Sequence, residues 1–223
     1  MPSSEQLSVA FYDQLGAEGL AARTAPSWDE QILSRLRELL VPRQRILDVG
    51  CGYGRITIPL ARSGFDVTGL DLSDRLLQAG RDRAESECAV VGWIHANMCC
   101  MPLPDNAFDI VLCLWSAFHE LLEKEEQVRA ALEMYRVLRP GGWCLVEGPL
   151  FRPATAEEIA LGRRSGLGNR VSMDIVCGLS NPHFCHDPDS FGQLMEQARI
   201  ECFKIYEESW AGRPRQLLRF VKH

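Results

Sequence analysis

The stretch Ile46-Leu47-Asp48-Val49-Gly50-Cys51-Gly52-Tyr53-Gly54-Arg55 decides the fold of this chain. It starts as an apolar run, continues with three glycines at alternate positions, and leads into an amphipathic stretch from Ile56 to Arg62. Glycines let the backbone turn tightly after a strand and come close to a ligand. The stretch therefore predicts a strand, a glycine-rich turn and a helix, an arrangement that binds nucleosides in parallel sheets.

An acidic residue ends the next apolar run. Asp71 closes Val67-Thr68-Gly69-Leu70-Asp71 and lies 23 residues after Asp48 (71 − 48). A carboxylate at the end of a second strand can accept hydrogen bonds from both hydroxyls of a ribose. The dinucleotide fingerprint G-x-G-x-x-G, counted from Gly50, needs a glycine where this chain has Arg55. A nicotinamide-dependent oxidoreductase is therefore a rival interpretation that Arg55 disfavours.

Short apolar runs alternate with longer amphipathic stretches from Arg45 to Glu147, which is typical of a parallel sheet with helices on both faces. The predicted strands are Arg45–Val49, Phe65–Leu70, Val90–His95, Phe108–Leu114 and Trp143–Glu147, then a C-terminal pair, Ile200–Tyr206 and Gln216–Val221, joined around Gly212-Arg213-Pro214. The short connection makes that pair antiparallel. We predict an α/β fold: a doubly wound, mostly parallel seven-stranded sheet with helices on both faces and an antiparallel C-terminal strand near its edge.

Sequence patterns that mark the starts of helices support the predicted α/β fold. Ser27-Trp28-Asp29-Glu30 has the pattern of a capping box before a helix, and Thr155-Ala156-Glu157-Glu158 has the same pattern. A second clear helix is expected from Glu123 to Leu138, and Asp187-Pro188 reads as an N-cap followed by proline at the first helical position.

We expect residues 1–223 to form one domain. Its expected parts are an N-terminal segment covering a cofactor (1–26), a cofactor-binding core (27–148), a substrate-lid insertion (149–186), and a C-terminal helix with a strand hairpin (187–223). The Pro- and Gly-punctuated insertion is interpreted as a lid because long loops in compact domains are usually functional.

The composition excludes several classes of protein. The 223 residues contain 24 Lys+Arg and 30 Asp+Glu, so the net charge of −6 disfavours an electrostatic nucleic-acid binder. The longest apolar stretch, Ile110 to Phe118, is too short to span a membrane, which takes ~20 residues. No basic segment followed by an apolar one opens the chain, which predicts a cytoplasmic protein. The nine cysteines are then expected to be reduced and packed as small apolar side chains.

The combined motifs resemble those of the class I S-adenosylmethionine-dependent methyltransferases. The matching elements are the acidic-x-Gly-x-Gly-x-Gly loop at Asp48–Gly54, the acidic Asp71, the polar Asn97 after the third strand, the F-D-x-V opening at Phe108–Val111 and the L-R-P-G-G turn at Leu138–Gly142. The resemblance covers residues 27–148 and, by topology, the C-terminal hairpin. It implies a Rossmann-like fold, S-adenosylmethionine as cofactor and S-adenosylhomocysteine as product.

The resemblance also implies a cofactor site, made of Tyr12, Asp48, Gly50, Cys51, Gly52, Gly54, Asp71, Leu72, Asn97, Met98 and Leu114. Asp71 would hold the ribose, Leu72 would pack on the adenine, and Asn97 would face the adenine amino group. The family usually has Asp at position 97, and the Asn keeps an acceptor oxygen but removes a charge. Tyr12 lies in a segment that folds over the cofactor in similar proteins, with simple packing as the alternative.

Methyl transfer is a direct displacement in which alignment does much of the work, so a general base is needed only when the acceptor arrives protonated. His119, which follows the fourth strand, is the best candidate for the base, because the carboxyl ends of strands form the site in such sheets. The alternative is that His119 caps a helix or positions the substrate. Glu120 is expected to be a residue of a first helical turn.

We expect Trp115, His119, Arg152, His183 and His186 to contact the substrate. The run His183-Phe184-Cys185-His186-Asp187 lacks the second paired cluster of a structural zinc site, so no metal is predicted. Arginines of the insertion, including Arg163, Arg164 and Arg170, could bind an anionic substrate or could form a solvated face.

The sequence thus favours a methyltransferase with a small-molecule acceptor. An RNA or protein acceptor, and an inactive cofactor-binding accessory subunit, are the alternatives. No membrane partner is expected and nucleic acid is disfavoured, whereas the oligomeric state and the acceptor atom are not specified by the sequence.

Overall fold

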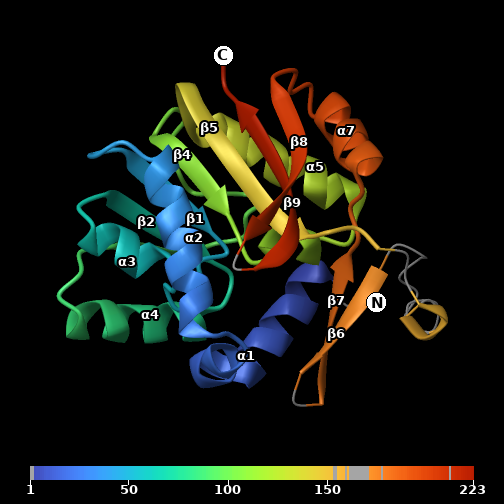
Figure 1. Ribbon diagram of the computed structural model, residues 1–223, viewed down its shortest axis with the longest axis horizontal. Coiled ribbons are helices and arrows are strands. Elements are labelled where there is room, and N and C mark those ends of the chain that lie inside the picture. The colour runs from blue at the N-terminus through green and yellow to red at the C-terminus, as the bar shows by residue number, and fades with distance from the viewer. Residues whose placement is uncertain (1–2, 153–154, 159, 161–170, 177, 211) are drawn as a thin grey trace.

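One seven-stranded sheet organises the chain. The computed structural model describes residues 3–152, 155–158, 160, 171–176, 178–210 and 212–223. The sheet order is β3-β2-β1-β4-β5-β9-β8 (Figure 1). The strands are β1 Arg45–Val49, β2 Asp66–Asp71, β3 Gly92–His95, β4 Phe108–Cys113, β5 Leu138–Pro149, β8 Phe203–Trp210 and β9 Arg213–Val221. Strands β1 to β5 pair in parallel, and β9 is antiparallel to both β5 and β8. The predicted fold is confirmed.

Helices cover both faces because the strands are apolar on both faces. On one side Ile46 packs with α2 (Pro26–Leu39) and α3 (Thr57–Arg62). On the other side Leu47 packs with α5 (Lys124–Val137) and α7 (Pro188–Gln197). Successive side chains of a strand point to opposite faces, so neighbouring residues of β1 serve two separate cores. Helix α4 (Asp74–Ser86) lies beside β2 and β3.

The helix starts agree with the predictions except at α2. Asp187 caps α7 by accepting a hydrogen bond from the Ser190 N–H at 2.7 Å, and Thr155 Oγ1 accepts one from the Glu158 N–H at 3.2 Å. The predicted capping box at Ser27 is wrong. Pro26 occupies the first turn of α2, so the N-cap is Ala25, which makes no side-chain hydrogen bond.

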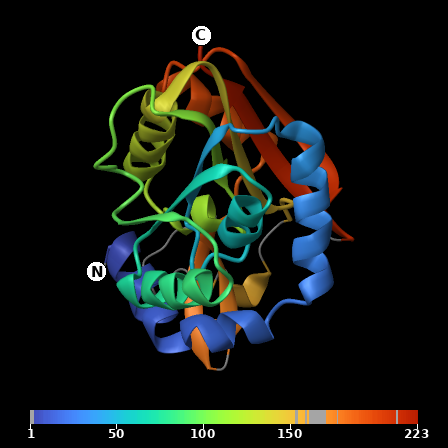
Figure 2. The ribbon, with the colours of Figure 1, turned by 90° about the vertical axis from the view of Figure 1, so that its left-hand side faces the viewer.

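Two elements lie outside the predicted set. Helix α1 (Ser4–Ala22), kinked at Gly16, starts with a capping box between Ser3 and Gln6. Strands β6 (Val171–Val176) and β7 (Leu179–Phe184) form a separate antiparallel hairpin. Figures 1 and 2 show α1 and the hairpin together below the carboxyl ends of the main strands. No described helix is long and apolar enough to cross a membrane.

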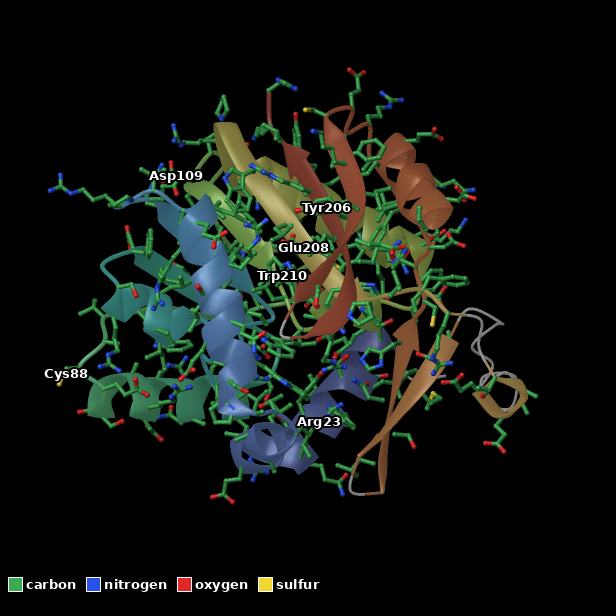
Figure 3. The ribbon with its side chains drawn as sticks, in the orientation of Figure 1. Arg23, Cys88, Asp109, Tyr206, Glu208 and Trp210 are labelled. Carbon is green, nitrogen blue, oxygen red and sulfur yellow. The ribbon has the colours of Figure 1, made fainter. Side chains whose placement is uncertain are left out.

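The aspartate of the F-D-x-V motif stabilises the end of the sheet where the parallel strands begin. Asp109, at the start of β4, accepts a hydrogen bond from the Arg45 N–H at 2.6 Å and pairs with Arg139. Figure 3 shows Asp109 at the far end of the molecule from Arg23, which ends α1. This aspartate therefore joins the beginnings of β1, β4 and β5 and lies far from the carboxyl ends of the strands.

The Trp93 ring of β3 packs against three glycines, where it leaves no room for a side chain. A methyl group at Gly54, Gly69 or Gly80 would come within 2.7 to 3.2 Å of the Trp93 ring. The indole thus occupies space that these glycines leave open between β3, the glycine loop and α4. Gly54 also has φ +80°, a conformation that disfavours other residues.

We predict opposite effects for two helical Gly→Ala substitutions. Gly80→Ala should destabilise the fold by about 1–3 kcal/mol, because its methyl would meet the rigid Trp93 ring at 2.8 Å. The matched Gly192→Ala, in α7 with nothing within 4 Å, should stabilise by up to ~1 kcal/mol through helix propensity. Urea unfolding of both variants measures this, and equal shifts would contradict the packing argument.

Candidate cofactor and acceptor site

A cavity of about 240 Å³ lies at the carboxyl ends of the central strands. Its walls come from the glycine loop after β1, the ends of β2 and β4, and helix α1. Two residues of β9, Arg213 and Arg215, and one of β7, His183, complete it. The carboxyl ends of strands at the point where the strand order reverses are the usual binding place in such sheets.

The glycine loop is held by backbone bonds to β2. The N–H groups of Gly50 and Cys51 donate to the Leu70 carbonyl at 2.8 and 3.1 Å. Gly50 has φ +74°, and a methyl there would overlap Ala117 of the short 3-10 helix η1 (Ala117–Glu120). Gly52 has φ +54° and only Leu76 near its open side, at 3.9 Å. The loop therefore brings η1 close at Gly50 and leaves room in the cavity at Gly52.

Two carboxylates line the cavity beside this loop, Asp48 buried and Asp71 half-buried. Asp71 accepts hydrogen bonds from the Gly52 N–H at 2.7 Å and the Ser73 N–H at 2.9 Å. Asp48 accepts one from the Thr57 hydroxyl at 2.6 Å. Burial raises the pKa of both carboxyls to about 6. Such acceptors are poorly solvated, which suits them to binding hydroxyl or ammonium donors.

Asn97 makes a contact that the sequence did not predict. Its Oδ1 accepts a hydrogen bond from the Cys99 N–H at 2.8 Å, and its Nδ2 donates to Glu5 of α1 at 2.9 Å. Both Asn97 and Glu5 line the cavity. The negative charge that Asn97 lacks is therefore supplied next to it by Glu5.

Side chains from two elements that line the cavity, α1 and β7, surround the Glu120 carboxylate. Tyr12 and Ser8 of α1 donate to its carboxylate, Ser8 at 2.8 Å, and His183 Nε2 of β7 lies 3.8 Å from Glu120 Oε1. Burial, followed by the Glu120 charge, raises the pKa of Tyr12 well above its usual value, so the phenol stays a donor. Glu120 was predicted only as a helical first-turn residue, whereas it joins α1 and β7 to the site.

The segment after β4 has a strained backbone that side-chain hydrogen bonds hold in place. Trp115 and Ser116 both have positive φ, +55° and +70°. The Glu147 carboxylate accepts a hydrogen bond from the Trp115 N–H at 2.7 Å and pairs with Arg215, whose Nη2 donates to Ser116 Oγ at 2.9 Å. Strained backbone of this kind persists where the surroundings fix it, and it is common at functional sites.

The structure brings most residues of the predicted site together. Those that line the cavity are Tyr12, Asp48, Gly50, Cys51, Gly52, Asp71, Leu72, Asn97, Met98, Leu114, Trp115 and His183. Gly54 lies outside the lining, and its contacts with Trp93 and Ile58 give it a packing role. Arg152 also lies outside and pairs with Glu158 at 2.6 Å. Arg163, Arg164 and Arg170 fall outside the described residues.

The other two histidines lie behind the cavity. The His119 ring is fully buried, fills the space left by Gly148, and packs edge-on against His186 and Phe191. Burial lowers the pKa of His119 well below its usual value. His186 stacks on Phe191 with ring centroids 4.2 Å apart. This placement does not support the predicted contacts of His119 and His186 with substrate, because neither ring lines the cavity.

Several lining residues were missed by the sequence prediction. They are Glu5, Trp28, Glu120, Arg213 and Arg215. The last strand was predicted as Gln216–Val221, whereas β9 begins at Arg213, so both arginines lie on the strand, and residues 213 and 215 share one of its faces. Nothing local to Glu5 or Trp28 places them near the glycine loop, since both come from helices that pack there only in the folded chain.

Comparison with known proteins finds a methyltransferase domain in this chain. Residues 46–142 match the family model described as "Methyltransferase domain". Methyltransferase GfsG of Streptomyces halstedii is 30% identical over 188 residues, covering 83% of this chain and 62% of GfsG. The chain spans 42–62% of the length of the curated relatives it matches.

Solved structures share the fold. A SAM-dependent methyltransferase of Methanosarcina mazei superposes with a TM-score of 0.71 at 18% identity, covering 84% of this chain and 96% of that one. The [4+2]-cyclase SpnF superposes with a TM-score of 0.69 at 21% identity, covering 99% and 97%.

Residues 46–142 thus form a methyltransferase domain, and S-adenosylmethionine-dependent methyltransferases share the fold of the chain. These findings support S-adenosylmethionine as the cofactor.

We predict that Asp48→Asn stabilises the protein without ligand. A folded-state pKa of about 6, above the unfolded value of ~3.9, means that the favourable contribution of protonated Asp48 is present below pH ~4 and lost as pH rises through about 6. Removing the charge should therefore add about 1–3 kcal/mol at pH 8 and less at pH 5. Urea unfolding at both pH values measures this. Exposed Asp66→Asn is the control, and a pH-independent gain for Asp48→Asn would contradict the argument.

Proposed function

We propose that this protein is an S-adenosylmethionine-dependent methyltransferase acting on a small-molecule acceptor. The observation that carries the proposal is the single cavity that joins two chemically different ends. Asp71, Asn97 and the glycine loop line one end, and Trp115, Arg213 and Arg215 line the other. Cofactor and acceptor would therefore meet in one cavity, of which α1 forms a wall.

The described residues fit the cofactor. Asp71 offers a half-buried carboxylate to a ribose, and the open side of Gly52 leaves room beside it. Leu72 and Met98 supply apolar surface for a base, next to the polar Asn97 and Glu5 pair. The bound cofactor supplies an electrophilic methyl group on a sulfonium, which an acceptor takes by in-line displacement.

The chain's own residues would align the acceptor. Helix α1 forms one wall of the cavity and is held there by the bonds of Ser8 and Tyr12 to Glu120. When the acceptor arrives protonated, the proton can pass to Glu120 or His183, because both face the cavity and lie 3.8 Å apart. His119 is not used in this mechanism, since its ring lies outside the cavity lining.

A small acceptor is favoured over RNA by the net charge of the chain, which is −6. Because a neighbour of this fold is a cyclase, a cofactor-binding protein without methyl transfer is the second candidate.

We predict that S-adenosylhomocysteine binds and stabilises the protein. A ligand at ~100 times its dissociation constant adds ~2.7 kcal/mol, which raises the melting temperature of a chain of this size by several degrees at roughly 2–4 °C per kcal/mol. Asp71→Ala should abolish the rise, because it removes the half-buried acceptor. Asp74→Asn, an exposed acid in the first turn of α4, is the matched control. A rise with NADH alone, or none with any of these ligands, would contradict the proposal.

Methyl transfer itself has a separate test. The purified protein is incubated with S-adenosylmethionine and either the low-molecular-mass or the macromolecular fraction of a cell extract, and formation of S-adenosylhomocysteine is followed. Product with the small-molecule fraction alone is expected. Product only with the macromolecular fraction would point to an RNA or protein acceptor. Binding without product in either fraction would favour the non-methylating alternative.

A further inference from the structure

Two arginines of strand β9 line the cavity. Arg213 and Arg215 lie two residues apart, so their side chains leave the same face of the strand. Both line the cavity. They differ in burial, since Arg215 is only 7% exposed whereas Arg213 is an exposed residue.

Only one of these two charges is matched by an acid. Arg215 pairs with the buried Glu147. Arg55, a third guanidinium of the lining, pairs with Asp29 at 2.5 Å. Among the residues that the structure describes, no carboxylate lies within ion-pair distance of Arg213. Arg213 therefore contributes an unbalanced positive charge at this end of the cavity.

Aromatic rings surround this charge. The Arg213 guanidinium lies over Trp28, 4.9 Å from the ring centroid, and Arg55 lies over Trp115 at 4.2 Å. The two indoles are themselves stacked, with centroids 6.4 Å apart and planes inclined by 27°. Guanidinium groups stacked on rings keep their edge N–H donors available, in a fork that matches a carboxylate.

The donors at this end outnumber the acceptors. The buried indole N–H of Trp115 has no hydrogen-bond acceptor among the described residues. The other end of the cavity, at the ends of β2 and β3, has the opposite character, with the carboxyl groups of Glu5 and Asp71. The cavity is thus acidic where the positively charged cofactor is expected and basic where the acceptor is expected.

We propose that the acceptor is an aromatic or similarly planar molecule bearing a carboxylate, which Arg213 binds beside the Trp28 and Trp115 rings. This inference rests on the proposed function, because it assigns this end of the cavity to the acceptor. The competing occupant is the cofactor's own carboxylate, so the test must separate the two.

The probes are benzoate and benzamide, which match in size and shape and differ in charge. Binding to the full chain is measured by ligand-observed NMR titration, with and without saturating S-adenosylhomocysteine, and binding of S-adenosylhomocysteine is measured by calorimetry. Wild type is compared with Arg213→Gln, and with Arg81→Gln on the exposed face of α4 as a matched control.

Wild type and Arg81→Gln should bind benzoate about tenfold or more tightly than benzamide, the preference expected of one charge-assisted hydrogen bond. In Arg213→Gln that ratio should fall to about one, while the affinity for S-adenosylhomocysteine stays within about twofold of wild type.

Equal binding of the two probes to wild type, or binding of neither, would overturn the inference. So would an Arg213→Gln variant that keeps the benzoate preference and loses affinity for S-adenosylhomocysteine, because the arginine would then serve the cofactor. Failure of wild type to bind S-adenosylhomocysteine would instead refute the proposed function. The ratio of benzoate to benzamide affinity is measured without S-adenosylhomocysteine as well, so it tests the role of Arg213 separately.

Discussion

The buried ion pair between Glu147 and Arg215 is the interaction on which the site depends. It joins the ends of β5 and β9 and, through bonds to Trp115 and Ser116, holds two successive residues in left-handed conformations. Removing one partner of such a pair would leave an uncompensated charge in the core and release the strained turn. The position of η1, and of Glu120 at its end, follows from that turn. One pair at the edge of the parallel strands thus determines the shape of the cavity roof.

Two acids of the cavity lower the free energy of unfolding of the protein near neutral pH. Asp48 and Asp71 are carboxyls whose pKa of about 6 records poor solvation of their charged forms. Groups of this kind destabilise a folded protein near neutral pH and remain where a ligand needs them. Glu120 and Asn97 differ from these two acids, because side chains of α1 bond to them: Ser8 and Tyr12 donate to Glu120, and Glu5 accepts from Asn97. Helix α1 therefore pairs part of the polar lining of the cavity.

The sequence could predict whatever local patterns encode. The glycine loop, Asp71 and the doubly apolar strands predicted the sheet and much of the cavity lining, because each signal lies within a few residues. Side-chain direction after β4 was not encoded locally: two left-handed residues turn His119 into the core and Glu120 into the cavity. The lining that Trp28 and Arg213 contribute could not be predicted, since these residues are 185 positions apart in the chain (213 − 28). The β6–β7 hairpin was hidden by Pro182 and Gly178, which read as loop residues.

The place of β9 in the sheet sets an order on biosynthesis. β9 follows both β5 and β8 in the chain, yet it lies between them in the sheet. Until β9 has been synthesised, the apolar strand β5 has an unpaired side and β8 has no partner in the sheet. A strand with open backbone donors and acceptors is a template for misassociation, so the nascent chain is exposed to aggregation until β9 emerges. The same strand carries Arg213 and Arg215, so the lining of the cavity is completed only as the sheet closes.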